Sequence, residues 1–202
     1  ALVKSAFMDE ELQGHMNLTS ANSINVARFL PQAFYYFNAY AQAKKLGKAD
    51  NLTICVPSGN FGNITAGLFA QRMGLPIKHF IAANNANDIF YNYLLSGIYS
   101  PKASIQTIAN AMDVGDPSNF ARILDLYKSS HTEICNHISG ATYSDDEIVA
   151  TMKKCYEKTG YVLDPHGACG YQALKDNLKD GETGVFLETA HPAKFKEKVD
   201  AI

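Results

Sequence analysis

The stretch that decides the fold runs from Leu52 to Gly74 and reads LTICVPSGNFGNITAGLFAQRMG. Its first residues are apolar or β-branched, which predicts a buried strand over 52–56. A loop with two glycines follows, and residues 64–73 have the composition of a helix that Gly74 ends. Glycines let the backbone approach an anion closely, and the N–H groups at a helix start carry partial positive charge. The stretch therefore predicts a phosphate-binding loop over 58–63.

The spacing of the glycines narrows the kind of anion. Gly59, Gly62 and Gly67 do not follow the Gly-x-Gly-x-x-Gly pattern of dinucleotide-binding loops. No Gly-Lys-Ser or Gly-Lys-Thr follows, so the loop is not a Walker-type nucleotide loop. It either holds a single phosphate group or serves only as a tight connection between the strand and the helix.

Strands and helices alternate along the rest of the chain. Residues 77–83 predict a second strand, which completes a strand–helix–strand unit with a right-handed crossover. A long helix is predicted over 24–45 with a break at Pro31. One face of it carries Leu30, Phe34, Phe37 and Ala41. The other predicted elements are helices over 3–12, 89–95, 119–130, 144–158 and 166–178, strands over 161–163 and 185–187, and a long loop over 97–118. This alternation predicts an α/β fold with a mainly parallel sheet.

The composition excludes several classes of partner. The 202 residues are 47% hydrophobic and 19% charged, which suits one α/β domain over 1–202, with a leading helical segment over 1–50 and a phosphate-binding core over 51–202. A formal net charge of -2 gives no electrostatic reason to expect nucleic acid or an acidic membrane surface. No run reaches the roughly 20 apolar residues that span a bilayer. The four cysteines form no Cys-x-x-Cys pair, so we expect a reducing, cytoplasmic protein without a disulfide framework. Because the chain opens with helical character and without Met, we expect it to be part of something longer.

Several uncommon strings support a more specific interpretation. The loop SGNFGNITAG over 58–67 resembles the cofactor-phosphate loop of the threonine synthase family, in the fold-type-II group of pyridoxal-phosphate enzymes. The other strings occur in the order that family shows: NSIN at 22–25 with Arg28, MGLP at 73–76, NAMDVG at 110–115, DPH at 164–166 and TAHPAKF at 189–195. They extend over nearly the whole chain and match the C-terminal portion of a full-length enzyme.

The resemblance implies a fold, a cofactor and a reaction. The fold is the incomplete three-layer arrangement of fold-type-II enzymes, similar to the β subunit of tryptophan synthase, with helices on both faces of a mainly parallel sheet. The cofactor is pyridoxal 5'-phosphate. The reaction converts O-phospho-L-homoserine and water into L-threonine and phosphate.

The resemblance also assigns two groups of site residues. The cofactor is bound by Gly59, Asn60, Phe61, Gly62, Asn63 and Thr189. The substrate is bound by Ser23, Asn25 and Arg28, of which the arginine presents a planar fork of donors to phosphate. From the residues alone, Thr189 also fits an ordinary cap of the final helix, and Ser23 fits a helix N-cap followed by a surface arginine.

Other polar residues carry weaker signals. Three follow the second strand and either line the same cleft or form its turn: Asn84, Asn87 and Asp88. His131, Cys135 and His137 have a passable spacing for metal ligands, but no fourth ligand is near, so no metal is expected. His166 and His191 are expected to be packed, hydrogen-bonded histidines.

The reaction also needs a lysine that forms a Schiff base with the cofactor. In the family it stands upstream in a Lys-Asp context, which no lysine here has, and Lys194 carries no such role in the family. The chain alone is therefore expected to be inactive, and to self-associate through surface that the missing N-terminal portion would cover. Two other hypotheses remain: another fold-type-II enzyme, such as a serine or threonine dehydratase, and a non-catalytic phosphate-binding domain.

Overall fold

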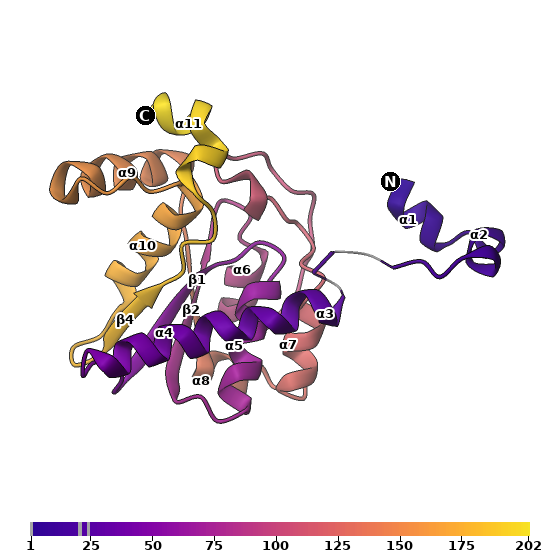
Figure 1. Cartoon of the computed structure of the whole chain (residues 1–202), viewed down its shortest axis with the longest axis horizontal. Helices are drawn as coiled ribbons and strands as arrows, with labels where there is room; N and C mark the ends of the chain where they lie inside the picture. The colour runs from indigo at the N-terminus through magenta and orange to yellow at the C-terminus, as the bar shows by residue number, and fades with distance from the viewer. Residues whose placement is uncertain (1, 20–21, 24) are drawn as a thin grey trace.

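The computed structural model describes residues 2–19, 22, 23 and 25–202 (Figure 1). Ile24, where the long helix is predicted to begin, lies outside the described residues. The helices are α1 (Leu2–Phe7), α2 (Glu10–His15), α3 (Val26–Phe29), α4 (Ala33–Lys45), α5 (Gly62–Arg72), α6 (Ile89–Ser96), α7 (Phe120–Leu126), α8 (His131–His137), α9 (Asp145–Thr159), α10 (Pro165–Asn177) and α11 (Lys196–Asp200). Short 3-10 helices are η1 (Leu30–Gln32), η2 (Asn110–Met112) and η3 (Pro192–Phe195). The strands are β1 (Leu52–Pro57), β2 (Ile77–Asn84), β3 (Ile138–Thr142) and β4 (Thr183–Phe186).

Over the described residues, the four strands form one parallel sheet in the order β3-β2-β1-β4. The chain moves outward from β1 through β2 to β3 and then returns to the other side of β1 for β4. The order of the strands therefore reverses between β1 and β4. In open α/β sheets, ligands bind beyond the carboxyl ends of the strands at such a reversal. The loops after Pro57 and Phe186 are thus the first place to look for a site.

Apolar side chains cover both faces of the sheet, because successive residues of a strand point to opposite sides. Ile54, Val56 and Phe80 pack in one cluster with residues of α4, α5, α6 and α8. Cys55 and Ile81 pack in the other cluster with residues of α9 and α10. This arrangement confirms the predicted three-layer α/β fold with a parallel sheet (Figure 1).

The predicted strands differ from the structure in two places. The predicted strand over 161–163 is irregular, and Val162 is 42% exposed. β2 pairs with β1 on one side and with β3 on the other, and the sequence of β3, ISGAT, carried no strand prediction. It is an edge strand in which a small residue, Gly140, lets Leu94 and Tyr91 of α6 approach closely. The predicted helix over 119–130 is also shorter, because Lys128 and Ser129 adopt positive φ after α7.

The predicted helix over 24–45 is interrupted at Pro31, which lies in η1 between α3 and α4. The face that packs on the sheet layer carries Phe29, Ala33 and Tyr36, which are at most 2% exposed. The predicted face lies beside it and points to solvent: Leu30, Phe34, Phe37 and Ala41 are all exposed. These helices therefore have two apolar faces, of which only one is covered.

Candidate functional site

The loop after β1 is held in a fixed shape by buried polar contacts. The Ser58 hydroxyl donates to Val56 O at 2.8 Å, and Asn84 Nδ2 donates to Ser58 O at 2.9 Å. Phe61 precedes α5 in the left-handed region, with a φ of 62°, which is unfavourable for a residue with a side chain. Its buried ring packs against Phe90 at 4.6 Å between ring centroids, and this packing maintains the conformation.

The backbone amides of this loop are open to a ligand. Within the described part of the chain, the amides of residues 59–63 donate no hydrogen bond to another residue. The loop also lies close to its neighbours, because a Cβ on Gly59 would be 2.7 Å from Met112 Cα, and one on Gly62 would be 3.0 Å from Ser23 Cβ. A turn of free N–H groups at the start of an 11-residue helix fits a phosphate-sized anion.

The side chains of the loop, in contrast, are used by the protein itself. Asn60 Nδ2 donates to Ser23 Oγ at 2.7 Å, and Asn60 Oδ1 accepts from the Ser118 amide at 2.7 Å. Asn63 Nδ2 donates to Pro57 O at 2.7 Å, and the Tyr36 hydroxyl donates to Asn63 O at 2.6 Å. The two asparagines therefore brace the loop, and its backbone is the part left for an anion.

A cavity of about 780 Å³ lies over this loop. Its walls come from α3, η1 and α4, from the η2 turn, and from the segment after β4. Nearly all the predicted site residues line it: Ser23, Arg28, Gly59, Asn60, Phe61, Gly62, Asn63 and Thr189. Asn25 does not; its Oδ1 accepts from the Ala27 amide at 3.0 Å as the N-cap of α3.

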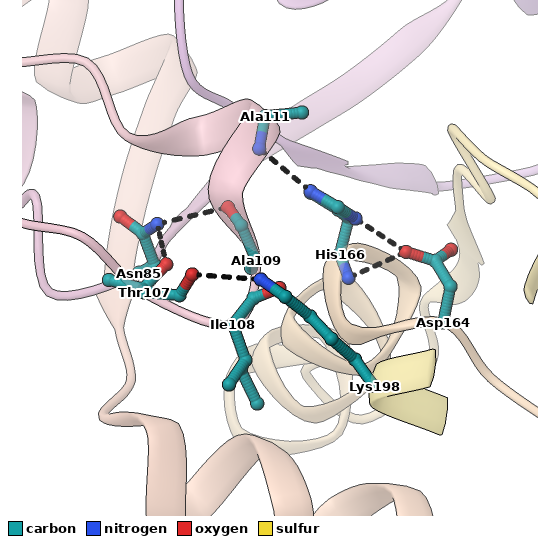
Figure 2. A network of polar contacts seen from close by, with 8 residues as sticks. All are labelled: Asn85, Thr107, Ile108, Ala109, Ala111, Asp164, His166 and Lys198. Carbon is teal, nitrogen blue, oxygen red and sulfur yellow. Dashed lines mark hydrogen bonds and ion pairs between the residues drawn. The ribbon is translucent and has the colours of Figure 1, made fainter. Parts of the chain in front are cut away.

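Sequence reasoning did not assign His166 to the cavity. The ring is buried, as expected, but it also lines the cavity. His166 Nε2 accepts from the Ala111 amide at 3.1 Å, so Nδ1 carries the proton and donates to Asp164 Oδ1 at 2.6 Å (Figure 2). Asp164 is the N-cap of α10 and Pro165 follows it, a pattern that predicts the helix start but not its neighbours across the cavity.

Glu188 adds a carboxyl group to the same wall. Burial and the neighbouring Asp164 raise the pKa of Glu188 to about 8. Although burial opposes it, the hydrogen bonds from the His166 ring and the His166 amide hold the pKa of Asp164 below its usual range. Glu188 is therefore largely neutral at pH 7, and the cavity keeps the positive charge of Arg28 and Lys194, which favours an anionic ligand.

The η2 turn lies against Gly59 at the cavity and is part of a network of polar contacts (Figure 2). Asn85 Nδ2 donates to Thr107 Oγ1 at 2.8 Å and to Ala109 O at 3.2 Å. Lys198 of α11 donates to Ile108 O at 3.1 Å. The predicted long loop over 97–118 is thus anchored where it meets the site.

The remaining polar candidates lie outside the cavity lining. Asn84 supports the loop, Asn87 donates to Ile105 O at 2.9 Å, and Asp88 pairs with Lys102 at 2.6 Å, so all three shape loops. Among the residues that the structure describes, no three His, Cys, Asp or Glu side chains are placed to hold a metal ion. Over the same residues, no helix has the length and apolar composition needed to cross a membrane.

Lys194 is the single lysine among the described residues that line the cavity. It lies in η3, five residues beyond Thr189 in the chain, and its side chain is exposed. Its Nζ lies 5.5 Å from the centroid of the Phe195 ring. A lysine therefore lies at the cavity, although not in the Lys-Asp context that the resemblance implies for the Schiff-base lysine.

Comparison with known proteins gives consistent matches. The model of the family described as "Pyridoxal-phosphate dependent enzyme" matches residues 10–189. Threonine synthase of Haemophilus influenzae is 53% identical over all 202 residues, which amount to 47% of its length. The crystal structure of threonine synthase from Escherichia coli gives a TM-score of 0.91 at 48% identity, over 99% of this chain and 46% of that one. A PLP-bound threonine synthase from Brucella melitensis gives a TM-score of 0.91 at 38% identity, over 99% of this chain and 48% of that one. The chain spans about half the length of each of these proteins.

Proposed function

Since the chain belongs to the family of pyridoxal-phosphate dependent enzymes, we propose that it forms the cofactor-holding portion of a threonine synthase. The proposed reaction of the whole enzyme converts O-phospho-L-homoserine and water into L-threonine and phosphate. The observation that carries the proposal is the loop over 59–63, whose amides are open to a phosphate and lie in a cavity with all the predicted site residues except Asn25.

The proposed task of the loop is to hold the cofactor phosphate. Backbone N–H groups that donate to an anion contribute about 1.5–3 kcal/mol each. Because Asn60 and Asn63 are already hydrogen-bonded to the protein, the loop is shaped before the ligand arrives. Bound pyridoxal phosphate supplies an electron sink for negative charge that develops on substrate carbon atoms. On the facing wall, the Thr189 hydroxyl is proposed to meet the ring nitrogen of the cofactor.

The substrate phosphate is proposed to bind beside Ser23 and Arg28, on the α3 side of the cavity. Ser23 Oγ accepts from Asn60 Nδ2, so this subsite and the cofactor loop share a direct hydrogen bond. Asn25 is proposed to act on this subsite indirectly, because its side chain caps α3, the helix that carries Arg28. The fork of the arginine suits a phosphate dianion.

We propose that the lysine for the Schiff base comes from the portion of the enzyme that this chain lacks. The 202-residue chain alone is then inactive and binds the cofactor only reversibly. Borohydride treatment of the chain with pyridoxal phosphate should leave no covalent adduct at Lys194, and the Lys194→Ala variant should behave alike. A stoichiometric adduct on Lys194 would overturn this part of the proposal.

The proposed partner of the chain is this missing N-terminal portion, and in its absence a second copy of the chain. Four large apolar side chains on α3, η1 and α4 support a contact of this kind: Val26, Leu30, Phe34 and Phe37, between 38% and 72% exposed. The proposed compartment is the cytoplasm, where the four free thiols would stay reduced.

The test of the function is a joined chain, with the N-terminal half of the Haemophilus influenzae enzyme placed before residue 1. Phosphate release from O-phospho-L-homoserine at a rate near that of the H. influenzae enzyme is expected. Ammonia release from serine or threonine without phosphate release would favour the dehydratase alternative. Reversible phosphate binding without either reaction would favour a non-catalytic domain.

A further inference from the structure

The η2 turn lines the cavity next to the phosphate loop and lies directly against Gly59. A Cβ on Gly59 would lie 2.7 Å from Met112 Cα and 2.9 Å from Ala111 O. Both atoms belong to the backbone of η2, so the loop and the turn are in direct main-chain contact. The position of η2 therefore sets how far the amide of Gly59 and its neighbours can open toward a bound phosphate.

The turn is fixed from two directions, which Figure 2 shows together. On one side, the loop that leads into it is held by Asn85, which donates to Ala109 O at 3.2 Å, and by Lys198, which donates to Ile108 O. On the other side, Ala111 N–H donates to His166 Nε2 at 3.1 Å. Of these contacts, the hydrogen bond that His166 accepts is made at Ala111, whose carbonyl oxygen lies against Gly59.

The His166 ring is itself held in one orientation and one tautomer. Asp164 Oδ1 accepts from both His166 Nδ1 at 2.6 Å and the His166 amide at 2.8 Å. The His166 and Asp164 residues are 1% and 0% exposed, so water cannot substitute for either contact. Because Nδ1 carries the proton, Nε2 is free to accept from the turn. Glu188 also neighbours Asp164, and it is largely neutral at pH 7 because burial and Asp164 raise its pKa to about 8.

We propose that His166 is a positioning residue for the bound phosphate: through Ala111 it holds the η2 turn against Gly59 and so fixes the width of the phosphate loop. This rests on the proposed function of that loop. The N-terminus of α10 is thereby linked to the phosphate loop through one acceptor nitrogen. His166 also lines the cavity, but its role in the proposal is exerted through the turn.

The experiment measures the dissociation constants of pyridoxal phosphate and of inorganic phosphate for the 202-residue chain by calorimetry. His166→Leu removes the acceptor, and both dissociation constants should rise about tenfold or more. His166→Gln keeps an acceptor oxygen at the end of a side chain of similar reach, and should stay within about threefold of the wild type. Rescue by glutamine separates a role at Ala111 from general packing. Equal weakening in both variants, or none in His166→Leu, would overturn the proposal.

Two further arms keep the proposal testable if His166→Leu folds poorly. Lys198→Met frees the same loop from α11 and should weaken phosphate binding, whereas Lys196→Met, on the same short helix, is the matched control and should not. The double variant combines Lys198→Met with Gly59→Ala. Its fold-loss of phosphate affinity should be smaller than the product of the two single losses, because both substitutions displace the same turn. Losses of affinity that multiply in the double variant would contradict the proposal. If the wild type binds inorganic phosphate but not pyridoxal phosphate, the proposed function fails while the phosphate measurements still decide the role of His166.

Discussion

Replacing Gly59 with alanine is expected to weaken the binding of pyridoxal phosphate. The new Cβ would lie 2.7 Å from Met112 Cα and 2.9 Å from Ala111 O. Carbon atoms in comfortable contact are about 3.5–4.0 Å apart, so the loop and the η2 turn must separate by roughly 1 Å. Both neighbours are backbone atoms, and no side chain can rotate away to relieve the clash. Gly59 does not have a positive φ, so the effect is steric rather than conformational.

The expected size follows from the cost of overpacking, which is about 1–3 kcal/mol. If that energy is needed to restore the loop geometry in the bound state, the dissociation constant for pyridoxal phosphate rises about 5- to 150-fold. Calorimetric titration of the 202-residue chain measures it. Gly62→Ala should have a smaller effect, because its nearest neighbour is the Ser23 side chain at 3.0 Å. Gly14→Ala is the control, since nothing lies within 4 Å of its added Cβ.

An unchanged affinity in a folded Gly59→Ala protein would refute the reasoning, because it would show that the loop and the turn need not touch for the ligand to bind. Equal losses of affinity in the Gly59 and Gly14 variants would refute it as well, since the loss would then not depend on contact between the loop and the turn.

Three other perturbations test separate parts of the account. Burial and Asp164 raise the pKa of Glu188 from 4.5 to about 8, so between these pH values the folded state binds more protons than the unfolded state. The free energy of unfolding should therefore fall as pH rises through this window. Urea titrations of Glu188→Gln should lack this fall. Asn60→Ala removes contacts to two serines across the site and should lower the free energy of unfolding by about 1–3 kcal/mol, as denaturant unfolding would show. Phe34→Ser should reduce self-association of the chain in sedimentation velocity, whereas Gln42→Ser, exposed on the same helix, should not; equal behaviour of the two variants would exclude this face as the contact.

The central part of the fold was predictable because its signals are local. The strand over 52–56, the glycine loop and the following helix all depend on residue types that are adjacent in sequence, and the structure has them as β1 and α5. In contrast, β3 was missed because ISGAT has one large apolar residue, and its identity as a strand comes from pairing with β2. The segment over 161–163 has the opposite character: it is apolar in sequence, but none of the strands in the described part of the chain pairs with it.

The candidate site shows the same division. The spacing of the loop residues predicts a site for one phosphate or a tight connection, and the structure adds that Asn60 and Asn63 serve as braces. His166 and Glu188 reach the same cavity only because the strand order reverses between β1 and β4, which brings distant segments together. The outward apolar face of α4 was likewise visible in the pattern, but a pattern cannot tell which of two apolar faces is covered.

The most direct test of the phosphate loop is a ³¹P NMR titration of the 202-residue chain with pyridoxal phosphate, alongside calorimetry with pyridoxal, which lacks the phosphate. We expect a shifted or broadened ³¹P resonance that inorganic phosphate reverses by competition, and much weaker binding of pyridoxal. A ³¹P resonance that the protein leaves unchanged, or pyridoxal binding as tight as that of its phosphate ester, would contradict the assignment of residues 59–63 as the site of the cofactor phosphate.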